Sequence, residues 1–267
     1  MEILKYELKI RYKALICWSI GLSLLFIAGS MEFEGLAGAN SESIDVVLNY
    51  YPPIVLALMG ITEAIDFSTL EGYVWVLGYF GTIIAAFYAI TLGVSVVNRE
   101  LIDKTFEFLF TKPVKRKYIL SIKIIAGALC LTLFSIINCL VSTLVMNPLD
   151  SNIDISHLMF ISSLGTYIIS LLFYTFSIFI SAIMKQQGKG SKIINICFLV
   201  AFVLGSVYDV VEKSDLLRFF TPFRYFLYEE VSTGTTNSFF LGIPVLVSIV
   251  FLILAYSYFD KRDLTEI

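Results

Sequence analysis

Residues 73–97 read YVWVLGYFGTIIAAFYAITLGVSVV, and residues 118–145 read YILSIKIIAGALCLTLFSIINCLVSTLV. Each stretch exceeds the ~20 apolar residues with which an α-helix crosses the hydrocarbon core of a bilayer. The first stretch has no charged residue, and the second has one, Lys123. Because a spanning helix satisfies its own backbone hydrogen bonds, and the alternation of β-barrel strands is missing, the pair predicts an all-α membrane protein.

The rest of the chain follows the same pattern. Hydrophobic residues make up 58% and charged residues 15%, whereas soluble domains are roughly half apolar and a quarter charged. Six blocks approach or exceed the spanning length, at residues 14–31, 73–97, 118–145, 158–184, 193–211 and 239–259. No internal repeat and no long polar linker interrupts them, so residues 1–267 are predicted to form a single transmembrane domain.

Basic residues lie in alternate connections between these blocks. Sixteen of the 19 Lys and Arg residues fall before the first span, between the second and third, between the fourth and fifth, or after the sixth, counting Lys123 at the start of the third span. By the positive-inside rule both termini are predicted to be cytoplasmic. Residues 32–72 hold seven acids and no Lys or Arg, so this segment is predicted to be external.

The connection between the second and third spans is the one densely basic segment, from Arg99 to Lys117. Glu100, Asp103 and Glu107 recur at helical spacing and form an acidic edge. Leu101, Thr105, Phe108 and Leu109 occupy another face, and Pro113 stops the helix. A short cytoplasmic helix with exposed aromatic side chains suits insertion into a groove of a partner. An amphipathic linker with no partner explains the pattern equally well.

Three other segments outside the apolar blocks carry recognisable patterns. Residues 1–13 can form an amphipathic helix in the headgroup plane, or act only as a positive flank that sets topology. Residues 54–59 predict a short helix, started by proline and stopped by Gly60, that caps the bundle externally. Residues 216–228, broken by Pro222, predict a re-entrant helical hairpin, with Asp215, Glu229 and Glu230 available to pair with Arg218 and Arg224. A long amphipathic loop is the alternative.

Catalytic patterns are missing from the sequence. The glycines around Lys189 lack the spacing of a phosphate-binding loop, and the single histidine, His157, cannot form a zinc cluster. The four cysteines lie inside predicted spans and are interpreted as buried structural thiols. Span interiors lack carboxylates, Asp209 near one span end being the nearest case, which disfavours an ion-coupled carrier. We therefore predict no catalytic, cofactor-binding or metal-ligating residue and no enzymatic activity in this chain.

The segment after the second span resembles a known pattern. The run Glu100…Thr105-Phe106-Glu107-Phe108-Leu109…Lys112-Pro113-Val114-Lys115-Arg116…Lys123 is similar to the signature of ABC-2-type transporter permeases, except that Lys104 and Lys115 replace a usual glycine and serine. Residues 51–60 and 68–73, the run 222–225 and the ending 259–264 are also similar to parts of that family. The resemblance covers nearly the whole chain through short motifs.

This resemblance implies a fold and a function. The chain would be the membrane subunit of an ATP-binding cassette transporter, with residues 1–13 as an elbow helix and the segment from Arg99 to Arg116 containing a coupling helix. The implied ATPase-contact residues are Glu100, Thr105, Glu107, Phe108, Leu109, Pro113 and Arg116, and the implied external hairpin holds Pro222 and Arg224. ATP would be hydrolysed in separate P-loop subunits.

The resemblance further implies the surroundings of the chain. Two ATPase subunits, a second permease copy or paralogue, and membrane lipid are the expected partners, and nucleic acid is not. Most such systems export amphiphilic, lipid-like or peptide cargo, here across the cell membrane of a bacterium or archaeon. The alternative from a different class is a non-transporting scaffold or regulator of an envelope complex.

Overall fold

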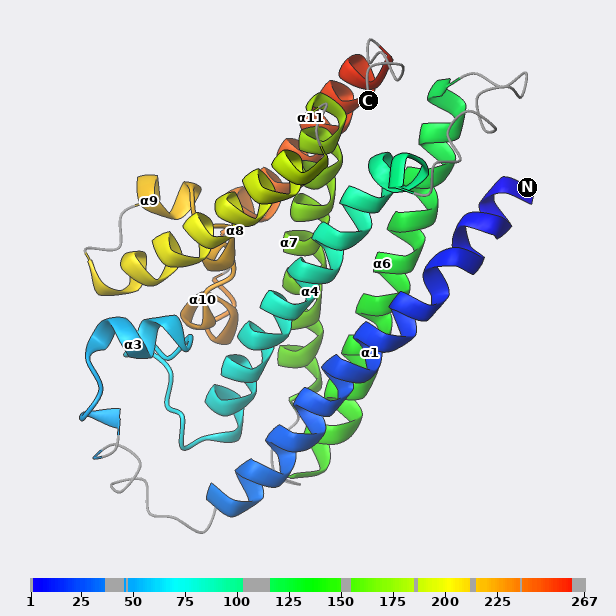
Figure 1. Ribbon diagram of the computed structural model, residues 1–267. Coiled ribbons are helices and arrows are strands. Elements are labelled where there is room, and N and C mark those ends of the chain that lie inside the picture. Colours follow the sequence, from blue (N-terminus) through cyan, green and yellow to red (C-terminus); the bar gives the residue numbers. More distant parts are fainter. Residues whose placement is uncertain are drawn as a thin grey trace.

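The computed structural model describes residues 2–36, 46, 48–102, 116–149, 155–184, 187–211, 215–235 and 237–260. The six long helices are α1 (Glu2–Leu36), α4 (Leu70–Ile102), α6 (Arg116–Met146), α7 (Ser156–Ile183), α8 (Gln187–Val210) and α11 (Ser238–Asp260). The short elements are α3 (Pro53–Leu58), η1 (Asn147–Leu149), α9 (Asp215–Phe219), η2 (Pro222–Arg224) and α10 (Tyr228–Ser232). Together they form an elongated helical bundle (Figure 1).

Each predicted span lies within or almost within one long helix, and all six are long and apolar enough to cross a membrane. The fold class predicted from the sequence is therefore confirmed. The helices continue beyond the apolar blocks, because the flanking charged residues are also good helix formers. The glycines around Lys189 belong to the first turns of α8 rather than to a turn before it.

Helices α4 and α7 form the centre of the bundle. They pack more extensively on each other than any other pair in the described structure does, and most residues in their most hydrophobic stretches are buried. Small side chains let them approach closely: Ala85 and Ala89 of α4 and Ser170 and Ser177 of α7 are fully buried. Close approach of this kind is how helices associate in lipid, where the hydrophobic effect gives no net attraction.

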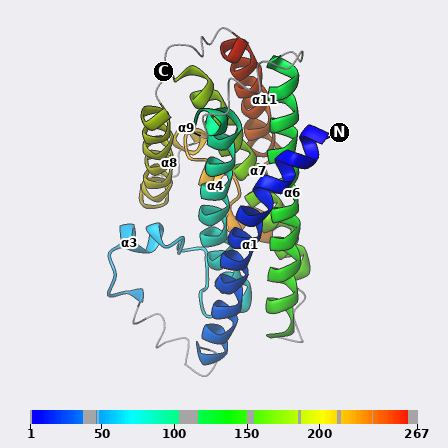
Figure 2. The ribbon, with the colours of Figure 1, turned by 45° about the vertical axis from the view of Figure 1, so that its right-hand side comes forward.

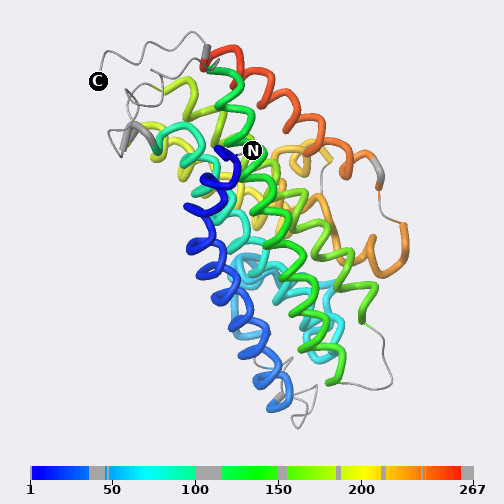
Figure 3. The backbone as a smooth tube through the Cα atoms, turned by 90° about the vertical axis from the view of Figure 1, so that its right-hand side faces the viewer, coloured from blue at the N-terminus to red at the C-terminus, as the bar shows by residue number. Residues whose placement is uncertain are grey.

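The other long helices surround this pair. Helix α6 runs beside α1 along most of its length (Figure 3), and α11 packs on α7. Helix α8 lies at one edge, apart from α1 and α6 (Figure 2). The prediction that all four cysteines are buried was wrong. Cys17 and Cys197 lie on the outward faces of α1 and α8 and are exposed, whereas Cys130 is buried.

The N-terminal residues do not form a separate helix. Helix α1 has 35 residues, which corresponds to about 52 Å of length, well above the ~30 Å of a hydrocarbon core. No proline and no glycine precedes Gly21, so nothing interrupts the helix. Lys5, Lys9 and Lys13 are exposed, as predicted for the cationic face. The placement of this end in the headgroup plane stays a prediction.

The buried face of α1 contains an ion pair that the sequence pattern did not predict. Glu7 and Arg11 pair with each other one turn apart, and both are almost fully buried. Further along the same face, Leu22 and Phe26 enter the core formed with α4 and α6. Both charged side chains lie on the same face of α1 as Leu22 and Phe26, and that face still packs on neighbouring helices near the N-terminal end.

The segment between α1 and α4 contains the predicted short helix. Helix α3 begins at Pro53, and the chain leaves it at Gly60, whose φ of 80° suits glycine. Helix α3 packs against the end of α8. A small core joins Ile61 and Ile65 to Val76 of α4, so this segment is packed against the bundle.

Candidate functional site

The connection between α8 and α11 consists of three short helices, α9, η2 and α10. Pro222 occupies the first turn of η2, where its fixed φ fits and its missing N–H costs nothing. Helix α9 packs on α8 and η2, and α10 packs on α7; Figure 1 shows α9 beside α8 and α10 between α8 and α3. We call residues 215–235 the hairpin. The predicted break at Pro222 is confirmed; the re-entrant position in a membrane stays a prediction.

Arg224 joins the hairpin to three other elements. Its Nε donates to the Asp209 carboxylate of α8 at 2.8 and 2.9 Å, and its Nη2 also pairs with that carboxylate. The same Nη2 donates to the Ala57 carbonyl of α3 at 3.2 Å. The guanidinium lies 4.7 Å from the centre of the Tyr79 ring of α4. Arg224 and the Asp209 side chain are both about 95% buried, so this is an interior ion pair.

Arg218 supports the hairpin from within. Its Nε donates to the Arg224 carbonyl at 2.9 Å and its Nη2 to the Tyr225 carbonyl at 3.1 Å. Its two Nη groups also bind both oxygens of Glu230, at 2.5 and 2.9 Å, in a forked arrangement. Its guanidinium lies 4.0 Å from the centre of the Phe240 ring. Arg218 therefore satisfies carbonyls that neither helix nor strand satisfies at this turn.

The charge of Arg218 also affects its partner. Burial raises the pKa of Glu230, but the hydrogen bonds and positive charge of Arg218, together with the Asn237 amide, outweigh burial. The pKa of Glu230 therefore lies below its ordinary value, and this carboxylate stays ionised at neutral pH.

A polar cavity of about 60 Å³ lies next to the Arg224–Asp209 pair. Its polar lining comes from five helical elements and the loop after α3: Thr62, Tyr79, Thr82, Ser162, Thr166, Asp209, Arg224 and Tyr228. Thr82 donates to the Gly78 carbonyl of its own helix, so Thr166 donates to Thr82 across the α4–α7 contact, at 2.7 Å. The cavity has room and hydrogen-bonding groups for ordered water. These groups can bind and orient a polar molecule but provide no activated nucleophile.

The sequence identified Arg224 and Pro222 but only part of their environment. Of the proposed carboxylate partners, Glu230 does pair with Arg218. Arg224 instead pairs with Asp209, which comes from the end of α8 and not from the hairpin. The available signal was that Asp209 is a carboxylate at the edge of an apolar block, a position that usually requires a partner.

Two of the predicted ATPase-contact residues, Glu100 and Arg116, lie where α4 ends and α6 begins. Arg116 opens α6 and is exposed. Glu100 lies in the last turn of α4, but its side chain is outside the described part of the structure. Thr105, Glu107, Phe108, Leu109 and Pro113 also lie outside the described residues. Their assignment to a coupling helix therefore stays a prediction.

A family model described as ABC-2 family transporter protein matches residues 1–264. No curated protein matches the sequence. In the described ranges, no three His, Cys, Asp or Glu side chains lie close enough together to hold a metal ion. The match covers both ends of the bundle, including the hairpin and the segment between α4 and α6.

Proposed function

The chain belongs to the ABC-2 transporter family, and we propose that it is the permease subunit of an ATP-binding cassette exporter. A family match over nearly the whole length, together with six helices able to cross a membrane, carries this proposal. Two P-loop subunits hydrolyse ATP, and a second permease copy or paralogue completes the transporter. The cargo is amphiphilic or lipid-like, or a peptide. The six apolar helices fit such a cargo.

The orientation that we propose has the end with both termini in the cytoplasm of a bacterium or archaeon. The described Lys and Arg residues support it, because those in α1, at the end of α4, at the start of α6 and at the start of α8 gather at this end. The residues between α4 and α6 then face the ATPase, and residues 37–69 lie on the external side. The hairpin reaches into the external half of the membrane domain.

The decisive experiment is purification of the chain from its native membrane in mild detergent, with mass spectrometry of the proteins that co-purify. We expect a stoichiometric P-loop ATPase, and we expect it to be lost when residues 100–112 are scrambled. Purification with only non-ATPase envelope proteins, under conditions that keep other transporter complexes intact, would contradict the proposal. It would favour the scaffold function instead.

A single substitution tests the predicted contact. Glu107→Arg reverses a charge on the acidic edge of the segment between α4 and α6, and we expect weaker ATPase association with normal membrane insertion. Glu2→Arg is the matched control, because Glu2 is exposed at the same end of the bundle and the total charge change is identical. Equal ATPase association in both variants would remove Glu107 from the contact.

A further inference from the structure

The first turns of α6 are attached to three other helices by hydrogen bonds. Tyr174 of α7 donates its hydroxyl to the Ile124 carbonyl at 2.8 Å. Lys123 donates to the Val96 carbonyl of α4 at 3.3 Å. Ser121 donates to Lys117 within α6, so the Tyr256 hydroxyl of α11 donates to Ser121, at 2.7 Å. We call these three interactions the α6 clamp.

The clamp adds polar links between helices whose most extensive packing lies elsewhere. Helix α6 packs most extensively along α1, whereas α4 and α11 pack most extensively on α7. All three clamp bonds leave α6 within four residues, from Ser121 to Ile124, and each reaches a different helix. A shift of α7 or α11 therefore changes the hydrogen bonds at this end of α6.

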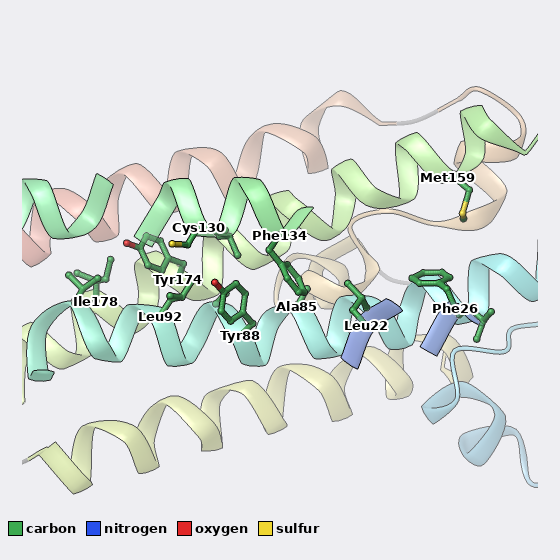
Figure 4. Close-up of a cluster of buried hydrophobic side chains, with 14 of the residues drawn as sticks. Leu22, Phe26, Ala85, Tyr88, Leu92, Cys130, Phe134, Met159, Tyr174 and Ile178 are labelled. Atoms are coloured by element: carbon green, nitrogen blue, oxygen red, sulfur yellow. The ribbon is translucent and has the colours of Figure 1, made fainter. Parts of the chain in front are cut away.

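Packing fixes the most buried of these bonds. Tyr174 is 1% exposed, and its hydroxyl is turned toward α6 beside Cys130 (Figure 4). The ring lies against Gly127, where an added Cβ would be 2.3 Å from the hydroxyl oxygen. Lys123 is also buried, with 3% exposed. Water does not compete for such groups, so their hydrogen bonds constrain geometry more strongly than surface bonds do.

The place of the clamp in the chain suggests what it does. Val96 lies six residues before the end of α4, and Ser121 lies five residues after the start of α6. The clamp thus ties together both helices that lead into residues 103–115. We propose that it sets the relative position of these two helix ends, the end of α4 and the start of α6, and that Tyr174 and Tyr256 are positioning residues through which α7 and α11 act on them. The proposal rests on the proposed function, in which residues 103–115 contact the ATPase.

The molecule contains a matched control for this proposal. Tyr167 of α7 also donates its hydroxyl to α6, at 3.1 Å from Thr132, because Thr132 itself donates to Ala128. This bond joins the same two helices as the Tyr174 bond does, but eight residues further along α6. A Tyr→Phe substitution removes one oxygen and keeps the ring at each of the three sites.

The test uses the full chain assembled with its ATPase and compares Tyr174→Phe, Tyr256→Phe and Tyr167→Phe. Hydrogen–deuterium exchange reports on residues 96–102 and 116–124, the two helix ends, and ATP hydrolysis is measured per assembled complex against the free ATPase. We expect Tyr174→Phe and Tyr256→Phe to raise exchange in these helix ends about three- to tenfold, the equivalent of one hydrogen bond. Stimulation of hydrolysis should fall in the same two variants, whereas Tyr167→Phe should leave both measurements within about twofold of wild type.

Each outcome has a defined meaning. Unchanged exchange in Tyr174→Phe and Tyr256→Phe, or an equal rise in Tyr167→Phe, would overturn the proposal. If Tyr174→Phe does not assemble, Ser121→Ala tests the clamp from the α6 side through its bond with Tyr256. A wild-type chain that stimulates no ATPase would contradict the proposed function and with it the positioning role, even if the exchange pattern is as expected.

Discussion

The hairpin and the α6 clamp hold different parts of the bundle by different chemistry. The hairpin depends on two arginines, each paired with a carboxylate and each donating to backbone carbonyls. The clamp uses two tyrosine hydroxyls and one lysine, and two of its acceptors are helix carbonyls. Loss of Arg224 strands a buried anion, whereas loss of the Tyr174 hydroxyl leaves a carbonyl that is still bonded within its helix. Loss of the Arg224 guanidinium should therefore destabilise the fold strongly, whereas loss of a clamp hydroxyl should destabilise it much less.

The largest effect is expected from Arg224→Leu. It leaves the Asp209 carboxylate buried without its guanidinium, and breaking such a pair costs about 3–5 kcal/mol. Thermal unfolding in detergent should show a large loss of stability. The double variant Arg224→Leu with Asp209→Leu should recover much of the loss, because no buried ion then lacks its partner. No recovery in the double variant would mean that packing around Arg224, rather than charge pairing, holds the hairpin.

A smaller effect is expected from overpacking at the clamp. Gly127→Val adds a Cβ that would lie 2.3 Å from the Tyr174 hydroxyl oxygen, and overpacking strain of this kind costs about 1–3 kcal/mol. Gly21→Val is the control, since nothing lies within 4 Å of the position of its added Cβ. The same unfolding measurement should separate the two variants. Equal stability would show that α6 and α7 can move apart without cost.

The smallest effect is expected from acid at the hairpin. The lowered pKa of Glu230 means that its pairing with Arg218 adds stability above the ordinary pKa of glutamate, and this contribution is lost as the pH falls through the lowered pKa. Its size is at most about 1 kcal/mol, because Glu230 is partly exposed. Glu230→Gln should flatten the acid limb of a plot of unfolding temperature against pH. Glu229→Gln, one residue away and exposed, should keep that limb.

Much of the fold could be predicted because its signals are local. The apolar blocks set the six long helices, Pro53 and Gly60 set the limits of α3, and Pro222 marks the break in the hairpin. The site was only half predictable for the opposite reason. Arg224 stood out as a rare charge, but its partner Asp209 and the Ala57 carbonyl come from other parts of the chain. Residues 1–13 indicated a helix in the headgroup plane or a positive flank. The buried pairing of Glu7 with Arg11 depends on how far the neighbouring helices extend, which the spacing of residues along one helix does not show.

Sequence alone thus determined the class of the protein. The length of an apolar segment and its lack of charge can be assessed one segment at a time, by comparison with the thickness of a bilayer. Tertiary structure decided which polar groups meet. The bond from Tyr174 to Ile124 joins residues 50 positions apart, and that from Arg224 to Ala57 joins residues 167 positions apart. Helices in an apolar environment can pair in many ways at similar cost, so hydrogen-bond geometry and close packing, which no single segment encodes, select one arrangement.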